Sequence, residues 1–288
     1  MRFLYCVLVS ALAIWLAGDA NLRGQDADVE RLRDIKFKLM SADYRADLDE
    51  LARGRELLTT LKAHPTLGYL ACYWSGFAGL RLAINGPNRQ MSNVELERNL
   101  MAALRDTEES LRLKEDFADS HVSAGQIASW MAAILMSRDA GAMEKFKHRG
   151  AEAISEETRS WIDRTWKHLK RARELSPRNP RLPWVEAVIW YNIPAERGGS
   201  QEKAIAMYRE AAVLAREERV ADPLWPDFGE PEALMSLAWC LLKRASPDPA
   251  GAKDAADAAL RLRPDWFYVR EVLKPQIEVA LNPPQPKK

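Results

Sequence analysis

The chain has 288 residues, of which 47% are apolar and 29% are charged, so it can bury a sizeable core and intrinsic disorder is excluded as its main state. Its 42 basic and 41 acidic residues leave a formal net charge of +1. This balance excludes attraction of nucleic acid or of an anionic membrane by the charge of the whole protein. A charged partner has to be recognised by a local patch.

The first segment has the layout of a secretory signal. Met1 and Arg2 precede an uncharged apolar run over residues 3–18, and Gly18 and Ala20 supply small residues at the expected cleavage positions. The run is short for a membrane-spanning helix, which needs about 20 apolar residues. We therefore expect residues 1–20 to be a cleaved signal peptide, with an uncleaved membrane anchor as the alternative. Both outcomes place the rest of the chain outside the cytoplasm, for example in the periplasm.

After residue 30, apolar residues recur at helical spacing, and no alternating β-branched run competes with them. Proline and glycine residues separate the apolar stripes, as at Pro65, Gly86-Pro87 and Pro177. The sequence thus predicts an all-α protein. A helical domain over residues 43–281 follows an N-terminal segment over 21–42 and precedes a disordered tail over 282–288. Within that domain we expect a helix near 43–62, helix pairs near 66–113, 117–175, 180–217 and 229–263, and a capping helix near 266–281.

The ends of these helices share a pattern. Stops such as Leu175-Ser176-Pro177 and Leu262-Arg263-Pro264 align, and small residues follow three of the stops at a fixed distance, at Ser75, Gly125 and Ala187. This pattern resembles the tetratricopeptide repeat, in which small residues let two antiparallel helices approach closely and a proline ends the second helix. The resemblance implies an irregular α-solenoid of about four helix pairs with a C-terminal capping helix, because the unit lengths vary.

A closer likeness rests on two loops. The chain has a Gly-Gly loop over residues 193–200 and a Pro-x-aromatic-Gly loop at Trp225-Pro226-Asp227-Phe228-Gly229. In this it is similar to a group of exported bacterial repeat proteins that have no assigned activity. The likeness bears on fold and location. Residues 222–229 are interpreted either as a lid over the groove of the solenoid or as a plug in the seam between the third and fourth pairs.

The repeat register predicts which side chains line the inner groove of the solenoid. In three of the pairs these positions offer an aromatic residue beside polar groups, which is the composition of an interface anchor. The alternative interpretation is that bulky aromatics fill gaps between unequal helices. The predicted partner-binding residues are Gln126, Trp130, Arg181, Trp184, Tyr191, Asn192, Trp239 and Lys243.

The cysteines and histidines indicate no reactive centre. Cys72 and Cys240 fall in the first and fourth pairs, too far apart for a disulfide, so we expect two buried free thiols. The four histidines are scattered, and none has a partner one helical turn away that would share a metal ion. Residues 164–173 carry five basic residues and no acid, and we interpret them as an outward helix face rather than an anion-binding patch.

The hypothesis that these features favour is a non-catalytic scaffold that presents a concave helical groove to a protein or peptide partner. No phosphate loop, nucleophile elbow or zinc motif occurs in the sequence, so we expect no enzymatic activity and predict no catalytic, cofactor-binding or metal-binding residue. Nucleic acid is not an expected partner, and membrane contact is expected only through an uncleaved N-terminal segment. The alternative is a small-molecule-binding accessory protein of a transport system.

Overall fold

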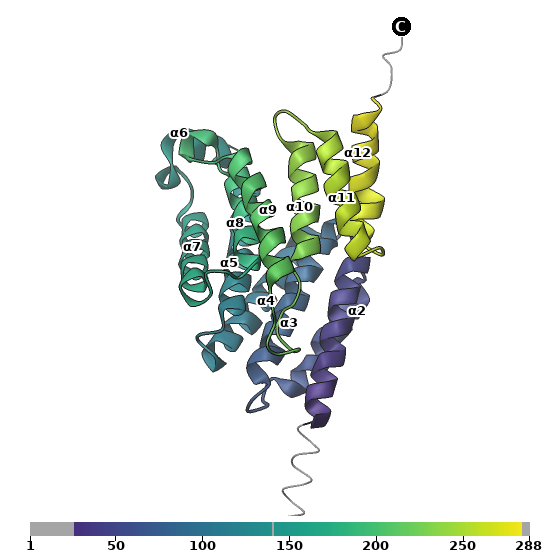
Figure 1. Ribbon diagram of the computed structural model, residues 1–288. Coiled ribbons are helices and arrows are strands. Elements are labelled where there is room, and N and C mark those ends of the chain that lie inside the picture. The colour runs from purple at the N-terminus through teal and green to yellow at the C-terminus, as the bar shows by residue number, and fades with distance from the viewer. Residues whose placement is uncertain (1–25, 140, 284–288) are drawn as a thin grey trace, which may run out of the picture.

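The computed structural model describes residues 26–139 and 141–283, which form an all-α protein without a strand and confirm the predicted fold class (Figure 1). The predicted signal peptide and residues 284–288 of the predicted tail lie outside the described residues. None of the helices described is long and apolar enough to cross a membrane. The helices are one over residues 26–45, α2 (Leu48–Leu58), α3 (Gly68–Asn85), α4 (Asn93–Leu113), α5 (Ala118–Arg138), α6 (Ala142–Arg149), α7 (Glu156–Leu175), α8 (Arg181–Asn192), α9 (Gln201–Glu217), α10 (Glu230–Lys243), α11 (Pro249–Leu262), a π-helical stretch (Tyr268–Leu273) and α12 (Lys274–Leu281).

Consecutive helices pack as pairs at the predicted places in the chain. Helix α3 packs on α4, α5 on α7, α8 on α9 and α10 on α11. Helix α6 lies in the connection between α5 and α7. Neighbouring pairs also contact each other, chiefly through α4 with α5 and α9 with α10. The pairs therefore stack side by side, as Figure 1 shows.

The second helix of every pair begins at a polar N-cap. The side chains of Ser92, Ser155, Ser200 and Asp248 each accept a hydrogen bond from a backbone N–H in the first turn of α4, α7, α9 and α11. The Glu95 carboxylate accepts a hydrogen bond from the backbone N–H of Ser92 and completes a capping box. These caps satisfy backbone donors that a helix start otherwise leaves unpaired, so the sequence defines where each second helix begins.

Small residues allow the two helices of a pair to approach closely. A Cβ atom added to Gly125 in α5 would lie 2.9 Å from the side chain of Leu169 in α7, which is closer than real side chains come. In the first pair, the close approach to α4 occurs at Gly76, next to the predicted Ser75. Ser75 instead donates a hydrogen bond of 2.7 Å to Asp106.

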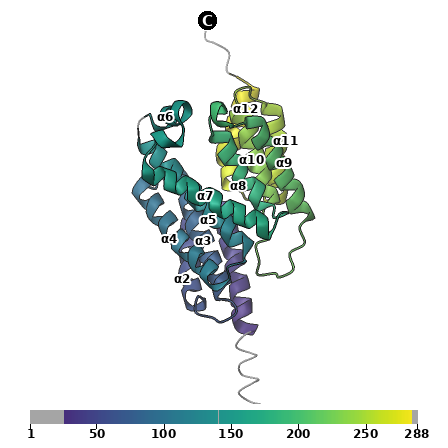
Figure 2. The same cartoon turned by 90° about the vertical axis from the view of Figure 1, so that its left-hand side faces the viewer.

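The stack of pairs closes on itself through its N-terminal helix. The sequence predicted a helix near 43–62 after an N-terminal segment, but the structure has one helix over 26–45 and a separate α2. Between them Ala46 adopts a positive φ of 51°. Tyr44, at the end of the first helix, donates a 2.5 Å hydrogen bond to Glu232 in α10 and packs edge-on against Trp266, with ring centroids 5.1 Å apart. The first and last parts of the described chain thus share one apolar core (Figures 1 and 2).

Cys72 and Cys240, the cysteines within the described residues, are buried and unpaired, which confirms the two predicted free thiols. Cys72 lies in α3 and Cys240 in α10. Burial raises the pKa of each thiol to about 11, so both stay protonated and unreactive near neutral pH.

The close approach of α5 and α7 gives a first prediction. Gly125→Leu should lower the free energy of unfolding by about 1–3 kcal/mol, because the added side chain has no room against Leu169. Ala206→Leu, at an exposed position of α9, is the matched control and should change stability by less than about 0.5 kcal/mol. Urea denaturation followed by circular dichroism measures both. Equal stability of the two variants would contradict the close packing of this pair.

Candidate functional site

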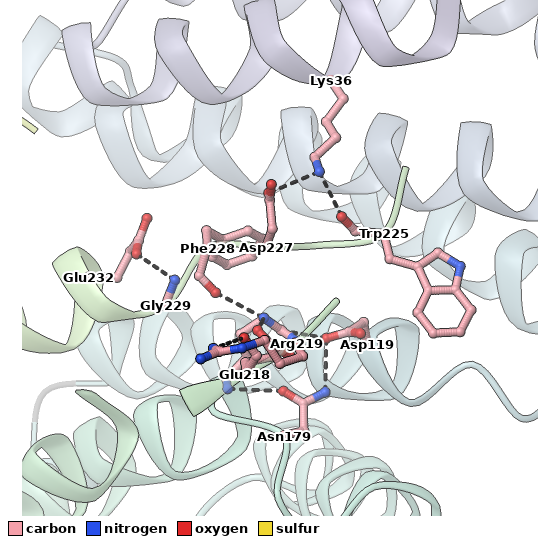
Figure 3. A network of polar contacts seen from close by, with 11 residues as sticks. Lys36, Asp119, Asn179, Glu218, Arg219, Trp225, Asp227, Phe228, Gly229 and Glu232 are labelled. Carbon is pink, nitrogen blue, oxygen red and sulfur yellow. Dashed lines mark hydrogen bonds and ion pairs between the residues drawn. The ribbon is translucent and has the colours of Figure 1, made fainter. Parts of the chain in front are cut away.

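The interior of the closed stack is occupied by one loop of the chain itself, residues 218–229, which we call the central loop. Lys36 donates hydrogen bonds of 2.8 Å to the carbonyl oxygen of Pro223 and 2.7 Å to that of Trp225, and pairs with Asp227 at 2.9 Å (Figure 3). The Trp74 indole donates a 2.9 Å hydrogen bond to the carbonyl of Leu224. The loop contacts the first helix, α3 and α8, so it is not confined to the seam between the third and fourth pairs that the plug interpretation predicted.

Arg181 secures the other side of the central loop. Its guanidinium donates hydrogen bonds to Asp119 at 2.5 Å, to Glu218 at 2.5 and 2.9 Å, and to the carbonyl oxygen of Phe228 at 2.9 Å. Asn179 adds a 2.9 Å hydrogen bond to Asp119 (Figure 3). The Arg181 side chain is only 4% exposed, and its cation is shared between two carboxylates. Such a charge is compensated inside the protein and is not available to a partner.

A second arginine lies in an aromatic enclosure beside the loop. The Arg81 guanidinium is 4.9 Å from the ring centre of Phe77, 5.3 Å from that of Trp184 and 5.6 Å from that of Phe228. It also pairs with Asp43 at 3.3 Å. Burial raises the pKa of the Asp43 carboxyl, and the charge of Arg81 opposes this rise. Cation–π contacts and one ion pair therefore hold this charge against the central loop.

Three of the predicted partner-binding residues are buried in this conformation, which corrects the expectation that they line an open groove. Trp184 is 7% exposed and donates a 2.9 Å hydrogen bond to Ser236, while Gln126 is 8% exposed. Arg181 is held as described above. The physical reason for two of them is that Phe228 of the central loop accepts a hydrogen bond from Arg181 and lies beside Trp184, with ring centres 6.5 Å apart. A contact between Arg181 or Trp184 and a partner would require the loop to leave.

The remaining predicted residues are accessible, and four of them lie on neighbouring helix ends. Tyr191 in α8 and Trp239 in α10 are both half-buried, and their ring centres are 4.8 Å apart. Asn192 and Lys243 are exposed, the first beside Tyr191 and the second one helical turn after Trp239. We call these four residues the aromatic rim. Trp130 is half-buried too, but it packs on a separate apolar cluster formed by α3, α4 and α5.

The structure also joins two histidines that are 47 positions apart in the sequence. His121 Nε2 lies 3.1 Å from the carbonyl oxygen of Glu115, and His121 Nδ1 lies 3.0 Å from His168 Nδ1. A carbonyl only accepts, so Nε2 of neutral His121 carries the proton and its Nδ1 accepts from His168 Nδ1–H. Burial, together with the positive charge that neighbouring groups carry, lowers the pKa of His168 to about 4. The sequence missed this pair because the two residues lie on different helices.

The described residues contain no group of three His, Cys, Asp or Glu side chains placed to hold a metal ion. Three titratable side chains of α5 and α10, those of Asp119, His121 and Glu232, have separate partners and do not form one cluster. His121 contacts His168, Asp119 contacts Arg181, and Glu232 accepts hydrogen bonds from Tyr44 and from the backbone of Gly229.

Comparison with known proteins finds a solved structure of similar fold and low sequence identity. No protein-family model and no curated protein matches this sequence. Among solved structures, the chain is similar to the HusA haemophore from Porphyromonas gingivalis, with a TM-score of 0.51 and 17% sequence identity. The match covers 76% of this chain and 97% of the haemophore. At this identity, the likeness shows a shared helical architecture.

The contacts of Lys36 lead to a second prediction. Lys36→Met should lower the free energy of unfolding by about 1–3 kcal/mol, because two partly buried carbonyl groups lose their donor. It should also speed cleavage by trypsin after Arg219 in the loosened loop. Lys38→Met, at an exposed position of the same helix, is the control and should leave both measurements unchanged. Wild-type resistance of the loop in Lys36→Met would show that this anchor is dispensable.

Proposed function

We propose that this chain is a non-catalytic binding protein that presents the aromatic rim to a protein or peptide outside the cytoplasm. The observation that carries the proposal is the accessible Tyr191–Trp239 pair, flanked by the exposed Asn192 and Lys243. Aromatic side chains bordered by polar groups are the usual anchors of protein interfaces. The N-terminal apolar run supports export, and the aligned helix stops support membership of the tetratricopeptide-like proteins.

The packing of the rim makes it suitable as a preformed contact surface. Tyr191 and Trp239 come from adjacent helix pairs, so their separation is set by the packing of α8 and α10 rather than by a flexible loop. Burying these rings against a partner gains apolar contact area with little loss of side-chain entropy, since each ring is already half-buried. The central loop covers Arg181 and Trp184 of the predicted groove. This proposal therefore limits the partner contact to the rim.

The proposal is tested by capture of partners in the native host. A tagged full-length chain is cross-linked, purified and analysed by mass spectrometry, and Trp239→Ala and Tyr191→Ala should each reduce recovery of the specific partner at least tenfold. Trp190→Ala is the matched control because its ring, on the same helix, packs instead on Trp166, with ring centres 5.6 Å apart. Undiminished recovery by both rim variants would exclude the rim as the contact surface.

A second candidate function is the binding of a small molecule, as in an accessory protein of a transport system. It is favoured by the likeness to a structure that is a haemophore, a protein that carries haem. If a tight ligand exists, its presence at 100 times the dissociation constant should stabilise the wild-type chain by about 2.7 kcal/mol. A thermal-shift screen that includes ferric haemin and other metabolites measures this as a rise in melting temperature. A flat screen argues against this second function and leaves the protein-binding proposal standing.

A further inference from the structure

The connection between α9 and α10 is longer than the packing of these two helices requires. Helix α9 ends at Glu217 and α10 begins at Glu230, and the two helices pack directly against each other. Neighbouring helices are usually joined by about 2–8 residues, and longer irregular connections usually have a function. The central loop instead makes an excursion to the first helix, α3 and α8. It can therefore change its position while α9 and α10 stay packed.

The middle of the loop is held through its backbone, as a bound extended peptide would be. The carbonyl groups of residues 223–225 accept hydrogen bonds from the side chains of Lys36 and Trp74, and that of Phe228 accepts one from Arg181 (Figure 3). Every peptide has such carbonyl groups, so these donors can bind a segment of another chain equally well. We call the surface that carries these donors the loop site.

Side-chain contacts beside the donors restrict which segment fits the loop site. The Phe228 ring packs beside Phe77 and Trp184, with ring centres 5.4 and 6.5 Å away. The Trp225 indole donates a 3.0 Å hydrogen bond to the hydroxyl of Tyr69. The loop site therefore accepts two aromatic residues that are three positions apart in an extended segment.

The charges of the loop site favour an acidic residue between these two aromatics. Asp227 pairs with Lys36 at 2.9 Å and is its one carboxylate partner among the described residues. The Lys36 side chain is only 6% exposed, so its charge needs compensation inside the protein. Arg81 and Arg181, in contrast, are also paired with carboxylates of the surrounding helices. A segment that replaces the loop thus has to bring an acid for Lys36.

We propose that the loop site is a recognition site for an extended peptide, which the central loop occupies until a partner segment of the same chemistry displaces it. The partner segment has an aromatic residue, a proline, an acidic residue and a second aromatic in succession, as in Trp225-Pro226-Asp227-Phe228. The loop is then an autoinhibitory segment. This surface is separate from the aromatic rim, and neither proposal depends on the other.

Exchange of one segment for another is easier than opening of the empty site. Departure of the loop alone would leave Lys36 without its acceptors and would expose the buried rings of Phe77 and Trp184. A segment of the same chemistry restores each of these contacts. The tethered loop nevertheless competes at a high effective concentration, so only the fraction of chains with a displaced loop binds the partner segment. Weakening the loop should therefore strengthen the binding of an added peptide.

The test uses a fluorescent peptide with the sequence of residues 222–229 and follows its anisotropy on titration with the full chain. Asp227→Asn in the chain weakens the loop and leaves the loop site intact, so this variant should bind the peptide at least tenfold more tightly than the wild type does. Glu217→Gln is the matched control and should bind as the wild type, because its carboxylate pairs with Arg178 at the surface.

Two further measurements locate the bound peptide. Adding Lys36→Met to Asp227→Asn should remove the gain in affinity, because the peptide then loses the donor and the charge that hold it. Trp239→Ala, in the aromatic rim, should leave peptide binding unchanged. The rim and the loop site can therefore fail independently.

Three outcomes would overturn the proposal. Absence of peptide binding in an Asp227→Asn chain that is folded by circular dichroism, and that trypsin cleaves faster after Arg219, would make the loop a permanent part of the fold. Equal affinity of this variant and the wild type would place the peptide elsewhere, as would binding that survives Lys36→Met. If trypsin cleavage is unchanged in Asp227→Asn, the same criteria apply to Phe228→Ala, which removes the ring beside Trp184.

Discussion

An irregular segment inside a helical protein must find donors for its backbone carbonyl groups, and here side chains from distant helices supply them. The central loop has no helix or strand partner along most of its course, so its carbonyl groups would otherwise be buried without hydrogen bonds. Lys36 and Trp74 bind the middle of the loop, and Arg181 binds its end. Each donor comes from a different helix or pair. These bonds therefore tie the first helix, the middle pairs and the loop into one unit.

This anchoring determines which surfaces are free for binding. A stack of helix pairs that resembles the tetratricopeptide repeat has an inner face for an extended ligand, but the chain occupies part of that face with its own loop. The ends of α8 and α10 beyond the loop remain accessible, and they carry Tyr191 and Trp239. The hydrogen bond from Tyr44 to Glu232 holds the first helix against α10. It therefore also fixes the curvature of the stack of helix pairs. The free contact surface is thus small and rigid.

The aromatic rim and the histidine pair lie on different helices. The rim, on α8 and α10, has apolar rings beside the exposed Asn192 and Lys243. The histidine pair joins α5 and α7 through a 3.0 Å contact between its two Nδ1 atoms. Neither cluster therefore shares a helix with the other.

The sequence by itself determined the fold class, the boundaries of the helix pairs and the free thiols, because these depend on local signals: helical periodicity, N-caps, proline stops and the distance between Cys72 and Cys240. The repeat register also predicted Tyr191 and Trp239 for one groove, and their ring centres lie 4.8 Å apart. Only the tertiary structure decided that Arg181 and Trp184 are buried, that Lys36 holds the central loop, and that His121 meets His168. These outcomes depend on how far the stack curves and on which distant segments it brings together. Curvature arises from the sum of many side-chain contacts between helices, and no local pattern encodes that sum.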